Sequence, residues 1–345
     1  MRKYTPEELP PAPRFHYHQG VYLSGVQRTY LLGGGNELYD YVKAWIDYYV
    51  DADGRILHTQ MDQFDDMQPA ILMFDLLEKT GDERYRKALD SITPPVERWP
   101  KNARGGFWHK FDRQNQMWLD TLYMIGPFCA MYAKNFGAKY LYEVIYQNMN
   151  LMRRNITDPK TGLLYHAWDD SKAAEWADSV TGCSAHFWGR AIGWYAVAIF
   201  DILDYMPADH PRREEFIGAG RDIINALIRY QDAKTGLWRQ VVNRGDDPRD
   251  WFETSCSSLY TYAIAKATKT GVLDDSYSPY AQKGYEGVIG SLAFEGDDLI
   301  ISNICIGTGV GDYEFYLNRP TVQNDLHGMG AFLLMCTEYY AAFGG

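Results

Sequence analysis

Apolar residues recur at intervals of three and four along most of the chain, the pattern of helices that bury one face. The clearest stripe has its apolar positions at Phe187, Ala191, Tyr195, Ile199 and Ile202. Similar patterns predict helices over residues 36–50, 67–79, 118–136, 221–231 and 257–269. The sequence therefore predicts an all-α fold.

A short glycine turn recurs between these helices, at Gly54, Gly105, Gly162 and Gly236, with a weaker copy at residues 297–301. Glycine supplies a positive φ, and the residues after it alternate like a short extended segment. Recurrence at roughly 50 to 75 residues marks a repeated supersecondary unit, here a helical hairpin. We expect one domain over residues 1–345, an α/α toroid, with residues 1–14 as an N-terminal tail.

Three of the turns are followed closely by a histidine: His58, His109 and His166. Equivalent turns of a ring of hairpins lie at the same end of the ring. These histidines are therefore predicted to face one rim.

The composition allows a large core, because 46% of the residues are hydrophobic. Aromatic residues reach 15%, including 10 Trp and 27 Tyr. Such an excess suits a protein that stacks ring faces against sugars, but a well-packed helical core would also explain it.

The formal net charge of −11 argues against a nucleic-acid partner or an anionic membrane surface. An acidic small molecule stays possible, since one Arg or His in a site can outweigh a distant field. The five cysteines are scattered without a C-x-x-C pair, which indicates neither a disulfide framework nor a zinc site. Without an apolar stretch typical of a signal peptide or a membrane span, we expect a cytoplasmic protein.

Asp120 is the strongest candidate for chemistry, within the segment QMWLDTLYM. Its helical neighbours include Met117, Tyr123 and Met124, and no basic residue stands near it in the sequence. A carboxyl group in apolar surroundings is expected to have a raised pKa, as a general acid requires. The alternative is a capping or core-satisfied Asp.

Asp65 is a second candidate carboxylate, but its local pattern favours a structural role. Gln68 follows it by three residues and Pro69 by four, which resembles a capping box at the start of a helix. From residue chemistry alone, capping is the better interpretation of Asp65.

Arg190 and Trp194 lie four residues apart and share a helix face. An Arg can bind a substrate carboxylate in a bidentate pair, and a Trp can stack on a sugar. The alternative is an Arg stacked on Trp at a solvated helix end.

Metal and cofactor signals are weak. The histidines are spread singly, without the paired spacing of a metal motif. The segment from Gly307 to Gly311 superficially resembles a dinucleotide loop, but it lacks the strand–turn–helix context. The sequence predicts no metal and no organic cofactor.

Several long segments together resemble glycoside hydrolase family 105, the unsaturated rhamnogalacturonyl hydrolases, which is related to the family 88 unsaturated glucuronyl hydrolases. The matching segments are HYHQG, FDDMQPA, GGFWHK, QMWLDTLYM, TGLLYHAWD, TGCSAHFWGRAIGWY, ETSCSSLYTYAIAK, ICIGTG and NDLHGMGAF. They run in order from about residue 15 to the C-terminus. The resemblance implies an (α/α)6 barrel.

The resemblance also implies roles for particular positions. Asp120 matches the family's general acid/base, and Asp65 matches its second carboxylate, which shifts the interpretation of Asp65 from cap to function. The positions that match substrate-binding residues are Tyr17, His109, His166, Trp188, Arg190 and Trp194. Ala70 and His18 depart from the family's more usual residues, Gly and an acidic residue.

The implied reaction releases a 4,5-unsaturated galacturonic acid from the non-reducing end of a rhamnogalacturonan (pectin) oligosaccharide. The substrate is a vinyl ether, so the reaction begins by hydration of the double bond rather than by attack at the anomeric carbon. Alternatives are an unsaturated glucuronyl hydrolase, a conventional inverting glycosidase on the same ring, a sugar isomerase or epimerase, and a non-enzymatic helical scaffold. We expect a small oligosaccharide as the partner, and the oligomeric state is not predicted.

Overall fold

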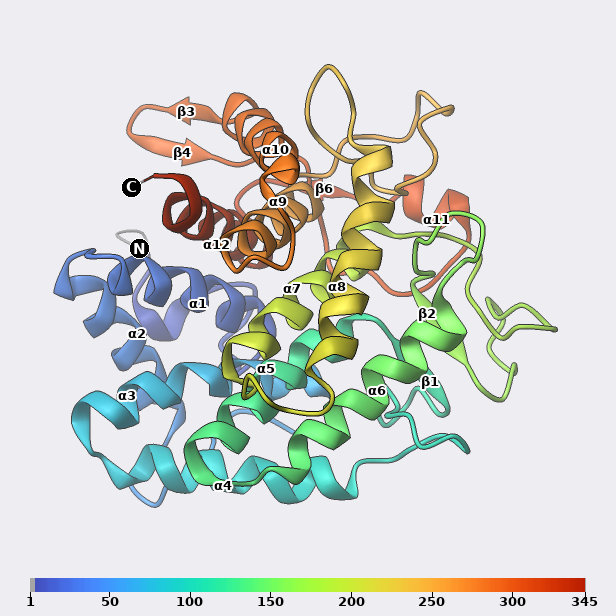
Figure 1. The fold of residues 1–345 in the computed structure, drawn as a ribbon. Coiled ribbons are helices and arrows are strands. Elements are labelled where there is room, and N and C mark those ends of the chain that lie inside the picture. Colours follow the sequence, from blue (N-terminus) through green and yellow to red (C-terminus); the bar gives the residue numbers. More distant parts are fainter. Residues whose placement is uncertain (1–3, 345) are drawn as a thin grey trace.

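The computed structural model describes residues 4–344, in which two layers of helices form a closed ring (Figure 1). The ring confirms the prediction of an all-α α/α barrel. The inner layer consists of α1 (Tyr17–Leu31), α3 (Leu72–Thr80), α5 (Asp120–Phe136), α7 (Gly189–Tyr205), α9 (Thr254–Lys269) and α12 (Leu326–Phe343). The outer layer consists of α2 (Asn36–Tyr49), α4 (Glu83–Arg98), α6 (Tyr140–Ile156), α8 (Arg213–Leu227) and α10 (Ser278–Gly290).

The ring closes because α12 packs against both α9 and α1, the helices on either side of it. Helices α5, α7 and α9 are buried on almost every side. Burial on every side places these helices in the protein interior, where they form part of the inner wall. Predicted helix boundaries are off by several residues in places: α3 begins at Leu72 after two 3₁₀ turns, and α8 covers residues 213–227.

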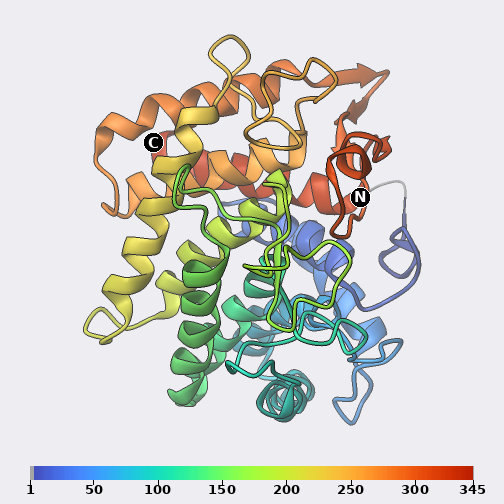
Figure 2. The same ribbon diagram turned by 90° about the vertical axis from the view of Figure 1, so that its right-hand side faces the viewer.

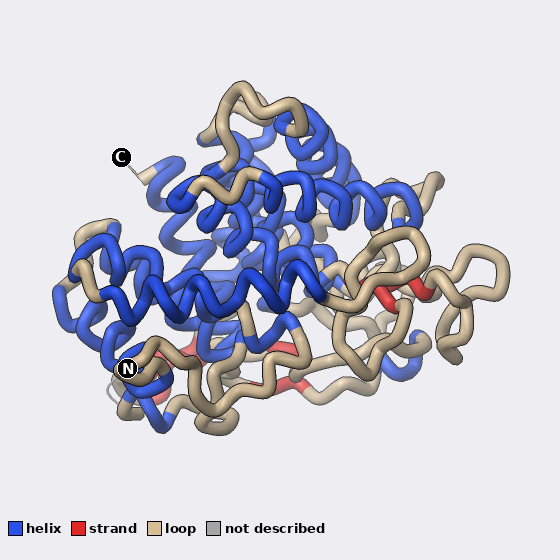
Figure 3. The backbone as a smooth tube through the Cα atoms, turned by 90° about the horizontal axis from the view of Figure 1, so that it is seen from below, coloured by secondary structure: helices blue, strands red, loops and turns tan. Residues whose placement is uncertain are grey.

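The loops that enter the inner helices gather at one end of the ring (Figures 2 and 3). They carry β1 (Gln116–Trp118), β2 (Ala167–Asp169), β5 (Ile304–Cys305), β6 (Thr321–Val322) and the short α11 (Tyr313–Leu317). The hairpin of β3 (Ala293–Glu295) and β4 (Asp298–Ile300) lies on the other side of Figure 1, where Leu299 lines a cavity with residues of α1 and α12. The strands form three antiparallel pairs, β1–β2, β3–β4 and β5–β6. We call the end where the loops gather the loop end.

The recurring glycine turn is present as predicted. Gly54, Gly105, Gly162 and Gly236 all have a φ between 72° and 87°. An extended bridge crosses three of these turns, between Val50 and Ile56, Lys101 and Phe107, and Thr157 and Leu164. The weaker copy is the β3–β4 hairpin around Gly296, whose φ is also positive.

The N-terminal segment packs on the ring from residue 4 onward, and residues 1–3 of the predicted tail lie outside the described range. The Gln19 side chain donates hydrogen bonds to the carbonyls of Pro10 and Ala12, at 2.9 Å each. The Arg14 guanidinium binds both carboxylate oxygens of Asp66 at 2.8 and 3.0 Å. Across the described residues, no helix is both long enough and apolar enough to traverse a lipid bilayer.

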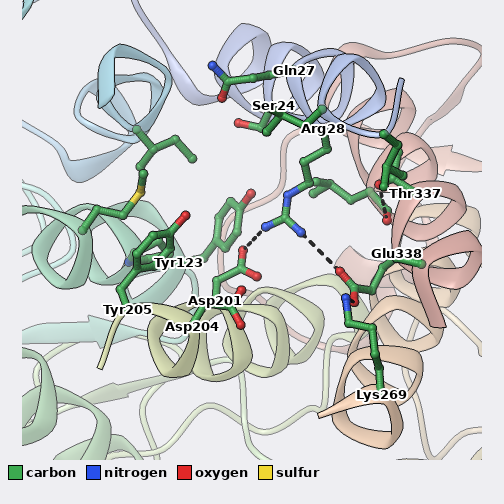
Figure 4. Close-up of a pocket in the computed structure, with 17 residues that line it drawn as sticks. Ser24, Gln27, Arg28, Tyr123, Asp201, Asp204, Tyr205, Lys269, Thr337 and Glu338 are labelled. Atoms are coloured by element: carbon green, nitrogen blue, oxygen red, sulfur yellow. Dashed lines mark hydrogen bonds and ion pairs between the residues drawn. The ribbon is translucent and has the colours of Figure 1, made fainter. Parts of the chain in front are cut away.

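The end of the ring opposite the loop end holds a pocket of about 270 Å³ with a charged network in its wall (Figure 4). Arg28 pairs with Asp201 at 3.0 Å and with Glu338 at 3.6 Å. Lys266 pairs with Asp201 at 2.6 Å and with Asp204 at 2.5 Å. These ion pairs join α1, α7, α9 and α12, so the network ties the inner helices together.

We expect Asp201→Asn to lower the free energy of unfolding by about 3 kcal/mol. Removing one partner of a buried ion pair typically costs about 3–5 kcal/mol, because a charge is left uncompensated. Here Glu338 and Asp204 still face the two cations, so the low end applies. Urea denaturation measures the change.

The control for that experiment is Glu143→Gln, which removes an exposed ion pair with Arg212. Exposed pairs contribute about 0–1 kcal/mol, so this variant should unfold almost like the wild-type protein. Equal unfolding curves for Asp201→Asn and Glu143→Gln would contradict a structural role for the buried network.

Candidate active site

Asp120 lies at the loop end, as the first residue of α5 directly after β1. Strand β1 pairs with β2, and His166 immediately precedes β2. The backbone N–H of Leu119 donates to the carbonyl of His166, which fixes the two segments side by side. The β1–β2 pair therefore holds a histidine against the start of α5.

Asp120, His166 and Tyr316 form a chain of polar contacts. The Oδ2 atom of Asp120 lies 3.4 Å from Nε2 of His166. The Nδ1 atom of His166 lies 2.8 Å from the Tyr316 hydroxyl. Burial raises the pKa of Tyr316, so its hydroxyl stays protonated and can donate to Nδ1. With Nδ1 as acceptor, the proton of a neutral His166 sits on Nε2 and points toward Asp120.

The predicted raised pKa of Asp120 is wrong for this structure. Burial does oppose ionisation, but His166 and His109 outweigh burial, so the pKa of Asp120 lies below its usual range. The position also differs from the expected helix interior, since the first turn of a helix favours negative charge. His166 and His109 are distant from Asp120 in the sequence, so the apolar neighbours of Asp120 alone gave the wrong direction for its pKa.

Asp65 does not cap a helix, so that interpretation is also wrong. It lies in a 3₁₀ turn (Phe64–Asp66), and no side-chain cap is present at Met67 or Ile71, the residues before the next two helical segments. Its Oδ2 atom lies 3.1 Å from Nζ of Lys110 and 3.8 Å from Nε2 of His16. Burial opposes ionisation of Asp65, but the charges of Lys110, His109 and His16 prevail and lower its pKa to about 2.

His109 is influenced by both carboxylates, and Trp118 stacks on it. Their rings stack with centroids 4.3 Å apart, and Trp118 also meets the His166 ring edge-on at 5.4 Å. Burial lowers the pKa of His109 to about 4, although the charges of Asp65 and Asp120 act in the opposite direction. His109 is therefore neutral at neutral pH and within electrostatic reach of both acids. We call Asp65, Asp120, His109, Lys110, Trp118 and His166 the carboxylate cluster.

Tyr17 and Trp188 border the carboxylate cluster. Trp188 packs on His166 with ring centroids 4.6 Å apart. The pKa of Tyr17 is raised by burial, with Arg190, Asp65 and Asp120 among the charges that act on it. Both residues therefore adjoin the two acids, and their role in binding substrate stays a prediction.

Arg190 is buried, and its guanidinium group already forms hydrogen bonds within the protein. It donates to the carbonyls of Cys305 and Ile306 at 2.6 and 2.7 Å and lies over the ring of Trp188. Trp194 is buried deeper in the ring and stacks on Tyr123 at 4.6 Å. The sequence predicted that Arg190 and Trp194 would share a face, yet each has a different aromatic partner.

Reasoning from the sequence missed two residues of the carboxylate cluster, Lys110 and Trp118, and also Tyr316, which contacts His166. Lys110 and Trp118 stand next to residues that were noted, within GGFWHK and QMWLDTLYM. Tyr316 lies in a segment that has no sequence motif pointing to a functional role. Conversely, His58 is exposed beside Tyr48 and does not join the carboxylate cluster. A position shortly after a turn glycine is therefore not sufficient to bring a histidine into the site.

Two acids, two histidines and an aromatic face make this cluster suited to proton transfer on a sugar ring. The glycine-rich segment after β5 is an irregular loop, so it offers no dinucleotide-binding turn. The described strands are all antiparallel, which also argues against that fold type.

Comparison with known proteins agrees with this picture. The family model described as Glycosyl Hydrolase Family 88 matches residues 1–343. The unsaturated rhamnogalacturonyl hydrolase YesR of Bacillus subtilis is 27% identical over 306 residues, covering 84% of this chain and 79% of YesR.

Two solved structures extend the comparison. A family 105 glycoside hydrolase of C. acetobutylicum superposes with a TM-score of 0.93 and 32% identity, covering 99% of this chain and 96% of that one. The unsaturated glucuronyl hydrolase of Bacillus sp. GL1 shares the fold, with a TM-score of 0.70, 12% identity and coverage of 96% and 87%. The chain is therefore a glycoside hydrolase and belongs to family 105, which is related to family 88.

Proposed function

We propose that the enzyme removes a 4,5-unsaturated galacturonic acid from the non-reducing end of rhamnogalacturonan oligosaccharides. The observation that supports this most directly is the placement of Asp120 against His166, with Asp65 held nearby by Lys110. The likeness to YesR, an unsaturated rhamnogalacturonyl hydrolase, supports the choice of substrate.

The first step is protonation of carbon 4 by Asp120. The double bond of a vinyl ether is electron-rich, so the proton adds at carbon 4 and positive charge develops at carbon 5, shared with the ring oxygen. Asp120 must be protonated for this step, although its pKa is low in the free enzyme. Binding of the substrate places a uronate carboxylate nearby, and a like charge raises the pKa of a carboxyl group.

The second step is addition of water at carbon 5. Asp120 is then a carboxylate and can take a proton from that water. Asp65, ionised beside Lys110, orients the water and stabilises the cation. The product is a hemiketal that opens and releases the second sugar. The residues proposed to hold the sugar are Tyr17, His109, His166, Trp188, Arg190 and Trp194. Arg190 and Trp194 are buried, so they would act by supporting the residues that touch the sugar.

The test is the loss of ultraviolet absorbance of the unsaturated acid, followed across matched disaccharides. We expect turnover of unsaturated galacturonyl-rhamnose and none of its saturated counterpart. Preference for an unsaturated glucuronyl disaccharide would redirect the substrate assignment. Hydrolysis of saturated glycosides would support a conventional inverting glycosidase.

We expect kcat/KM to rise as the pH falls from about 8 to about 5, by up to about tenfold per unit. This quantity reports ionisation in the free enzyme, where the pKa of Asp120 is lowered. Above that pKa, the protonated fraction grows in proportion to the proton concentration. Initial rates in a series of buffers measure the profile.

His166→Gln is the matched variant for the pH profile. Removing His166 takes away the largest influence that lowers the pKa of Asp120, while burial still raises it. The pKa of Asp120 should rise, so kcat/KM should level off at a higher pH than in the wild-type enzyme. If kcat/KM levelled off at the same pH in both enzymes, His166 would not set the pKa of Asp120.

A further inference from the structure

A second group of ionisable side chains lies at the loop end, on the side of α1 and α12. His18 in the first turn of α1, and Asp325 and His327 at the start of α12, place one ligand atom each within 4.8 Å of one another. Nδ1 of His327 is 2.7 Å from Oδ1 of Asp325, and the His18 and His327 ring centroids are 5.0 Å apart. The carboxylate cluster contains none of these residues.

The tautomer of His327 follows from its surroundings. Its Nε2 atom lies 3.0 Å from the carbonyl oxygen of Cys305, which can only accept a hydrogen bond. Nε2 therefore carries the proton. In a neutral imidazole, Nδ1 then presents a lone pair.

That lone pair faces another acceptor. Nδ1 of His327 is fully buried, and Oδ1 of the Asp325 carboxylate lies 2.7 Å from it. Two acceptors at this distance repel unless a proton or a cation lies with them.

The surrounding contacts match those of histidine ligands. A metal-bound imidazole usually donates its other N–H to a backbone carbonyl or a carboxylate, as Nε2 of His327 does to Cys305. His18 is held on its other side by His16, whose Nδ1 atom lies 3.1 Å from Nδ1 of His18. Asp325 and His18 are partly exposed, which leaves an open side for water.

From this geometry we infer that His18, Asp325 and His327 form a binding site for a divalent transition-metal ion, Zn²⁺ foremost. Two imidazole nitrogens and one carboxylate oxygen suit such ions, with water completing the coordination. Tetrahedral zinc needs its ligand atoms roughly 3.3 Å apart, so the partly exposed His18 must swing inward. The site would fasten α1 to α12, the two helices that close the ring.

This inference does not depend on the proposed function, and it departs from the sequence-based expectation of no metal. The competing explanation is purely structural. Asp325 caps α12 by accepting from the backbone N–H of His327 at 3.3 Å, and the histidines would then be ordinary packed residues.

The experiment is a titration of the full-length, chelator-treated protein with Zn²⁺ alone, followed by calorimetry, and with Co²⁺ alone, followed by its visible ligand-field absorption. We expect one ion per chain. His18→Ala and Asp325→Asn should each weaken binding by at least about tenfold. Asn retains the helix cap, so Asp325→Asn separates metal binding from folding.

His58→Asn is the matched control, since it removes a histidine that lies outside the site and has a positive φ that Asn tolerates. It should bind Zn²⁺ like the wild-type protein. Failure of the wild-type protein to bind, or equal binding by wild type, His18→Ala and Asp325→Asn, would overturn the inference. So would a crystal soaked with Zn²⁺ whose anomalous peak lies away from these three side chains.

Discussion

Asp120→Asn should reduce turnover of an unsaturated disaccharide by about 100- to 10,000-fold while the protein remains folded. Loss of a positioned general acid/base typically has an effect of this size. Asn keeps the shape of the side chain, and the same oxygen can still face His166. It carries no proton that can be transferred to carbon 4, so the chemical step should suffer far more than binding.

Two measurements make this prediction specific. The thermal unfolding temperature should fall only modestly, since the lowered pKa of Asp120 shows that the folded protein stabilises the charge that the substitution removes. Asp75→Asn is a control for loss of one carboxylate, because Asp75 pairs with Lys79 on α3, outside the carboxylate cluster. A turnover number for Asp120→Asn close to that of Asp75→Asn would remove Asp120 from the mechanism.

The fold could be predicted from the sequence because its signals are local. Helix periodicity is set by neighbours three and four positions away, and the repeated turn needs one glycine with a positive φ. Closure of the ring was not encoded locally, since an open solenoid has the same hairpins. It depends on the packing of α12 against α1, from opposite ends of the chain.

The candidate site could be predicted only in part, because its electrostatics are not local. Asp120 stands out among apolar neighbours, but its pKa is set by His166 and His109, which other loops deliver. Asp65 resembles a cap in its own segment, and only the structure shows Lys110 beside it. The resemblance that spans the chain proposed both acids as catalytic, whereas local chemistry singled out only Asp120 and predicted a raised pKa where the structure has a lowered one.

Arg190 and Trp194 show a further limit of helical spacing. Positions four apart share a face, but spacing does not tell how deep that face lies. Both side chains are only 1% exposed, and the Arg190 fork already binds two carbonyls of the loop after β5. Truncating either residue to Ala is therefore expected to lower stability as well as substrate binding.

Hydrolysis in heavy-oxygen water should place the label on carbon 5 of the former uronic acid and none on the anomeric oxygen of the released sugar. A saturated glycoside has no alkene to protonate, so its cleavage must involve the anomeric carbon. The unsaturated ring offers an easier route, because protonation at carbon 4 produces a cation that the ring oxygen stabilises.

The same reaction in deuterium oxide should leave one deuterium at carbon 4, delivered by Asp120 after it exchanges with solvent. A single carboxyl group that first gives and then takes a proton accounts for both labels. Asp65, paired with Lys110 and held at a pKa of about 2, stays ionised throughout and is poorly suited to serve as a second acid. Mass spectrometry and proton NMR of the products read out both positions. Products without deuterium at carbon 4 would exclude hydration of the double bond and favour direct attack at the anomeric carbon, with Asp65 and Asp120 as the acid–base pair of a conventional glycosidase.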